Sequence, residues 1–352
     1  MSAIVGFGEI MGRISMPGHL RIGQSMPGRV DVDFAGAEAN ALAFLAMLGN
    51  ETRMVTALPS NELGDACVAA LRHKGVGTSA ILRTDDGRLG LYFLEKGASQ
   101  RPGNVVYDRA GSAVALTRGE AYPWDRAMDG CAWLHLTGIT SALSESAAEA
   151  NLLAARTARN LGIPVSCDLN HRSKLWRWRP GADPEALARE QMLRLMPHVT
   201  HLVGGAGDMA LMLGVDGGES DELGWAAATL AAFPWLEAIG MTRRRAPNAS
   251  ELEWSGFLLD ARAGRHHEAP VDSHGTLRPY AIKHVVDRIG TGDAFTAGLI
   301  HGWNTGADGA WTVAFATAAS CLAHSIEGDA CMVGLAEVEA LMGGAGGGWV
   351  RR

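Results

Sequence analysis

Short apolar runs of strand length alternate along this chain with longer, alanine-rich segments of helical period. The apolar runs lie at residues 4–8, 53–57, 133–137, 164–168, 201–203, 238–242 and 282–286. The helical patterns lie at residues 37–48, 65–74, 144–161, 183–196, 222–233, 292–302 and 310–326. Strands that alternate with helices are typical of βαβ units, whose parallel sheet is covered on both faces. The sequence therefore predicts an α/β fold: a three-layer α/β/α sandwich on a mostly parallel central sheet.

Two stretches interrupt this alternation. Residues 12–34 are rich in glycine and proline, and residues 89–109 alternate and turn without a helical period. We expect both to form β excursions that make a small lid over a pocket, with exposed edges through which copies of the chain form a homo-oligomer. Sandwich and lid together form a single domain over residues 1–342, and the glycine-rich residues 343–352 form a C-terminal tail.

The composition excludes several classes of protein. A net charge of −7 without any basic run argues against nucleic acid or a membrane as partner. The five cysteines are scattered and lack CxxC spacing, as is typical of reduced cytoplasmic thiols. The N-terminus lacks the pattern of a signal peptide, and the longest apolar run, residues 310–323, is shorter than the roughly 20 residues of a membrane span. We expect a soluble cytoplasmic protein.

The strongest functional motif is Gly290-Thr291-Gly292-Asp293, which is expected to connect a strand directly to the apolar helix that follows. Glycines let the backbone turn tightly, so that the first N–H groups of the helix and its partial positive charge face an anion such as a phosphate. Asp293, in the first helical turn, is placed to accept a proton from a hydroxyl that attacks a phosphoryl group. The alternative interpretation makes Thr291 a helix cap and Asp293 a favourable first-turn carboxylate.

Two other nucleotide-binding motifs do not fit. No Gly-Lys-Ser/Thr sequence occurs, which excludes a P-loop of the Walker type. The stretch from Gly6 to Gly12 imitates a dinucleotide fingerprint, but its third glycine comes one position late and Pro17 breaks the helix that should follow. A dinucleotide-dependent dehydrogenase is therefore disfavoured.

A second candidate cluster, Gly-Ala-Glu-Ala-Asn, runs from Gly36 to Asn40 and opens the helix expected at residues 37–48. Gly36 permits close approach of a ligand to the backbone. Asn40, one turn later, offers an amide that both donates hydrogen bonds to a polyol and accepts them from it. A lone asparagine on a helix is also a common surface residue, so this interpretation depends on the motifs that accompany it.

These motifs occur in the order found in the ribokinase-like (PfkB) carbohydrate kinases, and the chain resembles the 2-keto-3-deoxygluconate kinases among them. The resemblance rests on Gly-Ala-Glu-Ala-Asn, on Tyr107-Asp-Arg-Ala-Gly-Ser, on Asp168-Leu-Asn-x-Arg-Ser-Lys-Leu-Trp and on Asp287-Arg-Ile-Gly-Thr-Gly-Asp-Ala-Phe. Only Gly-Thr-Gly-Asp is common to the whole family, whereas the second and third segments point to its sugar-acid branch. The resemblance implies a ribokinase-like fold and transfer of the γ-phosphoryl group of ATP, with Mg²⁺, to the C6 hydroxyl of a ketodeoxy sugar acid.

The resemblance also assigns roles to individual residues. The sugar-acid site that it implies comprises Gly36, Asn40, Tyr92, Tyr107, Arg109, Arg172 and Asp329, with Asp293 as catalytic base and Gly290, Thr291 and Gly292 stabilising the transferred phosphoryl group. For ATP it implies Asn170 and Thr242 together with the same Gly-Thr-Gly turn. The residue types agree with an acid substrate, because the guanidinium groups of Arg109 and Arg172 can each bind a carboxylate, or phosphate oxygens, through two hydrogen bonds. A surface salt bridge is the alternative role of each arginine.

The chain departs from the family at the metal motif. Family members carry Asn-x-x-Glu after the strand expected at residues 201–203, where it orients a magnesium-bound water, whereas this chain has Gly205 and Asp208 at those two positions. Asp208 is then the candidate Mg²⁺ ligand, since the nucleotide phosphates can supply much of the remaining coordination. Two rival functions stay open: another kinase of the family, acting on fructose, ribose or 5-keto-2-deoxygluconate, and a catalytically weak sugar-acid binding protein. A requirement for a carboxylate on the acceptor would distinguish the first rival, and consumption of ATP would distinguish the second.

Overall fold

The central sheet of the protein is mostly parallel. The computed structural model describes residues 3–344, and its strands are β1 (Ala3–Phe7), β2 (Met11–Ser15), β3 (Asp31–Ala35), β4 (Thr52–Pro59), β5 (Gly77–Thr84), β6 (Gly90–Glu95), β7 (Asn104–Asp108), β8 (Cys131–Thr137), β9 (Val165–Asp168), β10 (His201–Val203), β11 (Ala238–Arg245), β12 (Leu252–Asp260), β13 (Arg265–Ala269) and β14 (Tyr280–Ile282). The central sheet has the order β13-β12-β11-β10-β9-β8-β1-β4-β5, with β14 also paired to β12. Neighbours from β11 to β5 are parallel, and β12 pairs with β11, β13 and β14 in antiparallel fashion.

All seven predicted helices are present, with ends within three residues of the expected positions. The helices are α1 (Ile22–Ser25), α2 (Ala37–Met47), α3 (Glu62–His73), α4 (Ala113–Leu116), α5 (Trp124–Met128), α6 (Gly138–Ser141), α7 (Glu145–Asn160), α8 (Pro184–Leu195), α9 (Ala206–Asp208), α10 (Glu222–Ala232), α11 (Thr291–Thr305), α12 (Gly309–Ala323) and α13 (Leu335–Met342). Side-chain caps fix the N-terminal ends of several helices. The side chains of Asn61, Ser144, Asp183, Asp221 and Asp308 each accept a hydrogen bond from a first-turn backbone N–H group of the helix that follows.

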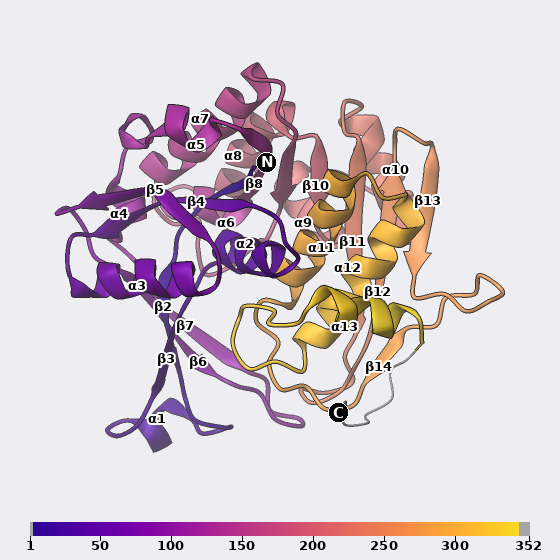
Figure 1. The fold of residues 1–352 in the computed structure, drawn as a ribbon, viewed down its shortest axis with the longest axis horizontal. Coiled ribbons are helices and arrows are strands. Elements are labelled where there is room, and N and C mark those ends of the chain that lie inside the picture. Colours follow the sequence, from indigo (N-terminus) through magenta and orange to yellow (C-terminus); the bar gives the residue numbers. More distant parts are fainter. Residues whose placement is uncertain (1–2, 345–352) are drawn as a thin grey trace.

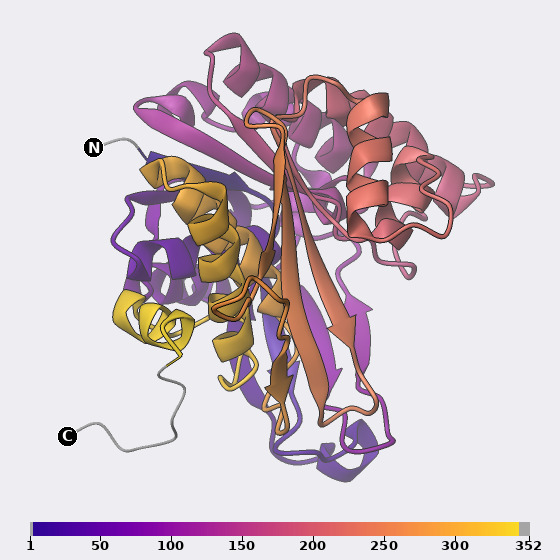
Figure 2. The ribbon, with the colours of Figure 1, turned by 90° about the vertical axis from the view of Figure 1, so that its right-hand side faces the viewer.

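Helices cover both faces of the central sheet (Figure 2). One face packs against α2, α3, α11, α12 and α13, where the buried core includes Leu42, Phe44 and Phe315. The other face packs against α5, α7, α8 and α10, with a core that includes Phe7 and Trp176. Because helices shield both faces, the inner parallel strands such as β1 and β10 are buried along their whole length. The predicted three-layer sandwich is confirmed.

The predicted lid is also confirmed. Strands β3, β2, β6 and β7 form a separate four-stranded sheet in that order. It projects from one side of the sandwich, with α1 at its far end (Figure 1). β2 and β6 pair in parallel, whereas the outer pairs are antiparallel.

Hydrogen bonds join the lid to the sandwich at several places, of which two lie on the β6–β7 hairpin. At the tip of the β6–β7 hairpin, the backbone N–H of Ser99 donates to the hydroxyl oxygen of Ser250 (3.0 Å), and the N–H of Ala249 donates to the carbonyl of Ser99 (2.7 Å). Ala249 and Ser250 lie in the loop between β11 and β12. At the other place, the ammonium group of Lys174 donates to the carbonyl of Val105 in β7 (2.6 Å).

The strand predicted at residues 282–286 was wrong. Only Ile282 belongs to a strand, β14. The N–H of Val285 donates to the carbonyl of Ser250 (3.0 Å) and that of Val286 to the carbonyl of His324 (2.9 Å), so two different loops hold this segment in place of a neighbouring strand. The segment that leads from β14 to the Gly-Thr-Gly-Asp turn is therefore irregular, and hydrogen bonds to two loops hold it in place.

The described residues contain no candidate for a membrane span, and their last helix is α13. Within residues 3–344, no helix combines the length and the apolar character that crossing a bilayer requires. α13 ends at Met342. Most of the predicted tail, residues 345–352, lies outside the described residues.

Candidate active site

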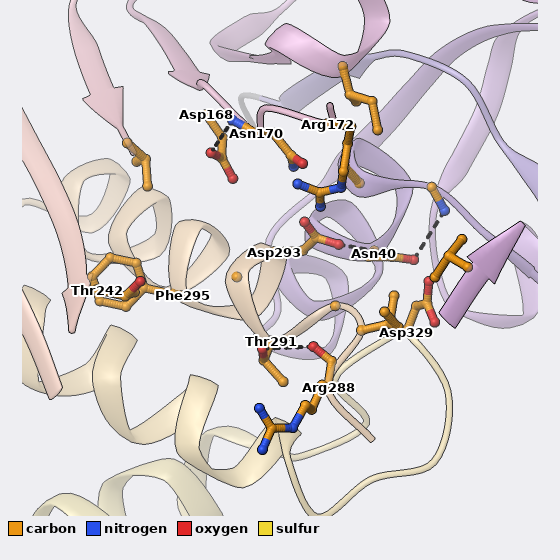
Figure 3. A pocket seen from close by; sticks show the side chains of 18 of the residues that line it. Asn40, Asp168, Asn170, Arg172, Thr242, Arg288, Thr291, Asp293, Phe295 and Asp329 are labelled. Atoms are coloured by element: carbon orange, nitrogen blue, oxygen red, sulfur yellow. Dashed lines mark hydrogen bonds between the residues drawn. The ribbon is translucent and has the colours of Figure 1, made fainter. Parts of the chain in front are cut away.

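A cavity of about 740 Å³ opens at the carboxyl ends of β9, β10 and β11, between the sandwich and the lid. In open α/β sheets, ligands bind at these strand ends. All but one of the site residues predicted from the sequence line this cavity: Gly36, Asn40, Tyr92, Tyr107, Asn170, Arg172, Asp208, Thr242, Gly290, Thr291, Gly292, Asp293 and Asp329. They come from segments far apart in the sequence, and the fold brings them to one place (Figure 3).

The Gly-Thr-Gly turn forms one wall of the cavity and starts α11. Gly290 has a φ of 79°, and a side chain there would place its Cβ 1.8 Å from the carbonyl oxygen of Asp329, so only glycine fits. The backbone at Gly292 is open, since a Cβ there would meet nothing within 4 Å. The N–H groups of the first helical turn have no partner within the helix, and they carry its partial positive charge. The turn is therefore shaped to receive an anion.

Asp293 stands at the centre of the cavity. The amide nitrogen of Asn40 donates to its carboxylate (2.7 Å), while the amide oxygen of Asn40 accepts from the N–H of Gly36 (3.3 Å). Burial raises the pKa of Asp293 to about 6, the hydrogen bond from Asn40 opposes this rise, the charge of Asp329 adds to it, and the charge of Arg172 opposes it. A carboxylate with a pKa near neutrality is suited to proton abstraction.

The start of α2, which carries Asn40, is fixed by a buried carboxyl group. Glu38 accepts hydrogen bonds from the hydroxyl groups of Thr137 (2.7 Å) and Thr140 (3.0 Å), at the end of β8 and in α6. Burial raises the pKa of Glu38 to about 7, so a neutral carboxyl is accessible at this position. The contact joins α2 to the carboxyl end of the sheet and thereby holds Asn40 against Asp293.

The carboxyl end of β9 and the segment that follows it place one carboxylate, Asp168, and one guanidinium group, Arg172, in the cavity. Arg172 and Asp168 extend toward Asp293 from the same side (Figure 3). Arg172 donates to the carbonyl of His171 (2.9 Å) and, among residues 3–344, makes no ion pair with a carboxylate, so its expected alternative role in a surface salt bridge does not apply. Burial, together with the charges of Asp293 and Asp208, raises the pKa of Asp168 to about 7. The backbone N–H of Asn170 donates to Asp168 (3.1 Å).

The lid side of the cavity ends in a buried polar cluster. The hydroxyl of Tyr92 in β6 donates to the carboxylate of Asp329 (2.5 Å). Arg13 in β2 makes ion pairs with both Asp329 and Asp287. Tyr107 in β7 lies beside Tyr92, with ring centroids 6.5 Å apart. The cluster presents hydroxyl and carboxylate groups, the partners that sugar hydroxyls require.

The opposite side of the cavity is basic and aromatic. Thr242 and Phe295 lie on the far side of Asp293 from Asp329 (Figure 3). Arg244 and Arg288 also line this part, and burial followed by the charge of Arg244 lowers the pKa of Arg288. The buried indole N–H of Trp254 has no hydrogen-bond partner among the described residues. Two arginines and an unused donor favour a ligand with several anionic or polar oxygens.

Arg109 is the predicted site residue that does not line the cavity. Its side chain is buried in an ion pair with Glu9, in which its Nε donates to the carboxylate (2.7 Å), and its guanidinium lies 5.5 Å from the ring centroid of Tyr107. Glu9 therefore already neutralises the charge of Arg109, and the guanidinium group packs beside the ring of Tyr107. Arg172 is left as the arginine that faces Asp293 directly.

Several residues of the cavity were missed from the sequence. Asp168, Lys174 and Arg288 all line it. Asp168 ends a buried strand, and a carboxylate at the carboxyl end of a parallel strand is a signal that could have identified it. Arg13 had no local signal, because both of its partners lie more than 270 positions away in the sequence.

The side chains of the cavity also fit a divalent cation whose coordination comes mainly from the phosphate oxygens of a bound molecule. Within the described residues, no three His, Cys, Asp or Glu side chains gather closely enough to hold a metal alone. Asp168 and Asp208 do line the same part of the cavity, and the buried side-chain oxygen of Asn170 lacks a hydrogen-bond partner in the structure. Oxygen ligands of this kind, with phosphate oxygens, are what Mg²⁺ prefers.

Comparisons with known proteins agree with this geometry. The model of the pfkB family of carbohydrate kinases matches residues 2–237 and 269–332. The chain is 32% identical to 2-dehydro-3-deoxygalactonokinase of Haloferax volcanii over 98% of both proteins, and 27% identical to 2-dehydro-3-deoxygluconokinase of Bacillus subtilis over 76% of this chain and 73% of that protein. The crystal structure of 2-dehydro-3-deoxygluconokinase from Thermotoga maritima is 38% identical and superposes with a TM-score of 0.87, covering 97% of this chain and all of the other.

The family match spans most of the chain, and the Gly-Thr-Gly-Asp turn and the lid lie around one cavity. Kinases of this family transfer a phosphoryl group from ATP to an alcohol. The protein belongs to the pfkB family of carbohydrate kinases and is a phosphotransferase with an alcohol group as acceptor.

Proposed function

We propose that the protein phosphorylates a 2-keto-3-deoxy sugar acid at its C6 hydroxyl with ATP, and that 2-keto-3-deoxygluconate is the acceptor. The observation that carries the proposal is the position of Arg172, a cation without a carboxylate partner among the described residues, directed toward Asp293 from the end of β9. A neutral sugar offers this cation no counter-charge. A sugar acid supplies the carboxylate that Arg172 lacks.

The acceptor is placed between the lid and the start of α2. The carboxylate of the acid binds Arg172, and its hydroxyl groups bind Asp329, Tyr92 and the Asn40 amide. Gly36 lines the same part of the cavity, and the packing of its backbone requires glycine, because a Cβ there would lie 2.1 Å from the carbonyl oxygen of Glu9. These contacts orient the C6 hydroxyl toward Asp293.

Asp293 then acts as the general base. Its carboxylate takes the proton of the C6 hydroxyl while the oxygen forms a bond to the γ-phosphorus, and the bond from that phosphorus to the β–γ bridging oxygen breaks to release ADP. The N–H groups that follow Gly290 stabilise the charge that develops on the transferred group. The triphosphate extends past Asn170 toward Thr242, Arg244 and the aromatic side of the cavity.

Mg²⁺ accompanies the nucleotide in this proposal. Asp208 and Asp168 would hold the ion, in part through water, together with the phosphate oxygens. When bound, Mg²⁺ neutralises charge on the phosphates. The ionised form of both carboxylates is needed for this role, and burial raises the pKa of each of them.

The C4 epimer, 2-keto-3-deoxygalactonate, is the second candidate acceptor. It is favoured by one observation, the 32% identity over 98% of both chains to a protein named 2-dehydro-3-deoxygalactonokinase. Both epimers carry the same carboxylate and the same C6 hydroxyl, so the residues that define the mechanism serve either.

A panel of acceptors tests the proposal. The purified protein is given ATP, Mg²⁺ and, in turn, both 2-keto-3-deoxy acids, 5-keto-2-deoxygluconate, fructose and ribose, while ADP release and the mass of the phosphorylated product are followed. We expect the highest kcat/KM with 2-keto-3-deoxygluconate, and background rates from Asp293→Asn. A neutral sugar phosphorylated more efficiently than every acid would refute the acceptor class, and equal rates from Asp293→Asn would refute the role of the base.

A further inference from the structure

Arg13 is a buried arginine of the lid that does not line the cavity. It lies in β2, and its side chain is only 2% exposed. Its guanidinium binds two carboxylates at once, Asp287 and Asp329. These three residues come from the lid, from the loop that leads into α11 and from the loop that follows α12.

Asp287 organises the backbone just before the phosphate-binding turn. Its carboxylate accepts hydrogen bonds from the N–H groups of Arg288 (2.8 Å) and Ile289 (3.1 Å), which directly precede Gly290, and from the N–H of Gly328 (3.4 Å). The position of the turn therefore depends on where this carboxylate is held.

Asp329 connects the same cluster to the acceptor side. Its carboxylate lines the cavity and accepts from the hydroxyl of Tyr92, while its carbonyl oxygen faces the Cα of Gly290 so closely that no side chain fits between them. A displacement of Asp329 would move a sugar-binding group and the phosphate-binding turn together.

Two buried carboxylates this close repel each other unless a cation lies between them or one of them takes up a proton. Burial raises the pKa of Asp329, Arg13 lowers it, and the charge of Asp287 raises it again. Burial alone would lower the pKa of Arg13, but its two carboxylate partners outweigh burial and raise it, so the guanidinium is always charged. Its planar fork serves two acceptors with fixed geometry, which an ammonium group cannot do.

We propose that Arg13 is a positioning residue that couples the lid to the phosphate-binding turn, so that the acceptor site and the transfer site take their active geometry as one unit. Arg13 touches neither substrate. It acts through Asp287 on the N–H groups of the turn and through Asp329 and Tyr92 on the acceptor. The inference rests on the phosphoryl-transfer role proposed for this turn and for Asp293.

Arg13→Met and Arg13→Lys test the proposal, with Arg243→Met as the matched control. Arg243 also bridges two carboxylates, Glu222 (2.5 Å) and Glu268 (2.7 Å), but does not line the cavity. We expect Arg13→Met to lower kcat about 100-fold, because small misplacements of reacting groups have effects of this size. KM for ATP should change little, and more ADP than phosphorylated product should form, because a lid that is poorly held admits water. Arg13→Lys should be intermediate, and Arg243→Met should match the wild type.

Hydrogen exchange supplies a readout that does not depend on the acceptor. In Arg13→Lys, amides of residues 288–292 and of β2 should exchange faster together, while those of α7 and β8 remain unchanged. A folded Arg13→Met enzyme with the kcat and ADP-to-product ratio of Arg243→Met would overturn the proposal. If Arg13→Met does not fold, wild-type kcat and wild-type exchange in Arg13→Lys would overturn it equally. A wild type that phosphorylates only a neutral sugar would instead overturn the proposed acceptor, and the Arg13 variants would then be assayed with that sugar.

Discussion

Replacing Asn40 by alanine should move the pH dependence of phosphoryl transfer to higher pH. The amide of Asn40 donates to the carboxylate of Asp293 over 2.7 Å, and this hydrogen bond stabilises the ionised base. Burial is the largest influence on that carboxyl group and raises its pKa to about 6, so the removal of a compensating donor must raise the pKa further.

The size of the shift follows from the strength of the lost contact. A hydrogen bond to a charged group contributes about 1.5–3 kcal/mol. Water replaces part of the contact at this partly accessible carboxylate, so about 1.4 kcal/mol remains, which equals about one pKa unit. At about pH 6, the ionised fraction of the base would then fall from about one half to about one tenth, a fivefold loss of rate. At about pH 9 the base is ionised in both proteins and this loss vanishes.

The assay is kcat/KM for the sugar acid at saturating MgATP, measured from about pH 5 to about pH 9, because kcat/KM reports ionisations of the enzyme before the acid binds. Ionisation of ATP affects both proteins equally and cancels in the comparison. Asn50→Ala is the control, since Asn50 follows the other end of α2 and donates to the carbonyl of Leu45 (2.9 Å). An unchanged or lower midpoint in Asn40→Ala, or an equal loss at both ends of the pH range, would show that Asn40 does not tune the base.

Four further predictions concern the same cavity and the lid. Asp293→Asn should lower kcat by about 10²–10⁴-fold. Because burial raises the folded-state pKa of Asp293, its ionisation weakens the fold as the pH rises from about 4 to about 6. Thermal scans should therefore show this variant more stable than wild type at about pH 8, by at most about 3 kcal/mol, but not at about pH 4. Arg172→Met should raise KM for the acid about 10–100-fold while KM for ATP changes little, which initial-rate kinetics with each substrate varied will measure; an equal rise in both constants would contradict its role. Asp208→Asn should raise the Mg²⁺ concentration needed for half-maximal rate severalfold, and a metal titration giving the wild-type value would remove this residue from the metal site. The open edges of the lid sheet should pair in a homo-oligomer, so sedimentation that finds a monomer at working concentration would refute pairing through the lid.

The layered fold was predictable because its signal is local. Buried parallel strands are continuous apolar runs, and the helices between them carry polar caps such as Ser144 and Asp183 at their starts. β13 was missed because its sequence, Arg-His-His-Glu-Ala, has no apolar alternation; its pairing with β12 alone makes it a strand. Residues 282–286 look like a strand because they are rich in β-branched residues, yet loops provide their hydrogen-bond partners.

Site residues, too, were predictable from the sequence only where their signal is local. Asp293 and its turn were identifiable, since glycine spacing and a first-turn carboxylate carry their chemistry within four residues. Arg109 and Arg13 were not, because the partner that decides the role of each lies about 100 or more positions away. The sequence shows that an arginine is present. Whether its charge is neutralised by a substrate or by a buried carboxylate depends on the fold.

The hydrogen bonds between Ser99 at the lid tip and the loop that carries Ala249 and Ser250 also bear on how acceptor preference can be re-engineered. Suppose that β6, β7 and the hairpin between them are replaced by those of a relative. The new hairpin tip then matches the relative's β11–β12 loop and not the loop of this protein. Such a chimera would take the relative's side chains at positions 92 and 107, and its lid would still close poorly. The smallest portable unit for changing the acceptor is therefore the hairpin together with residues 246–251, two segments separated by about 140 positions that have to be exchanged as a pair.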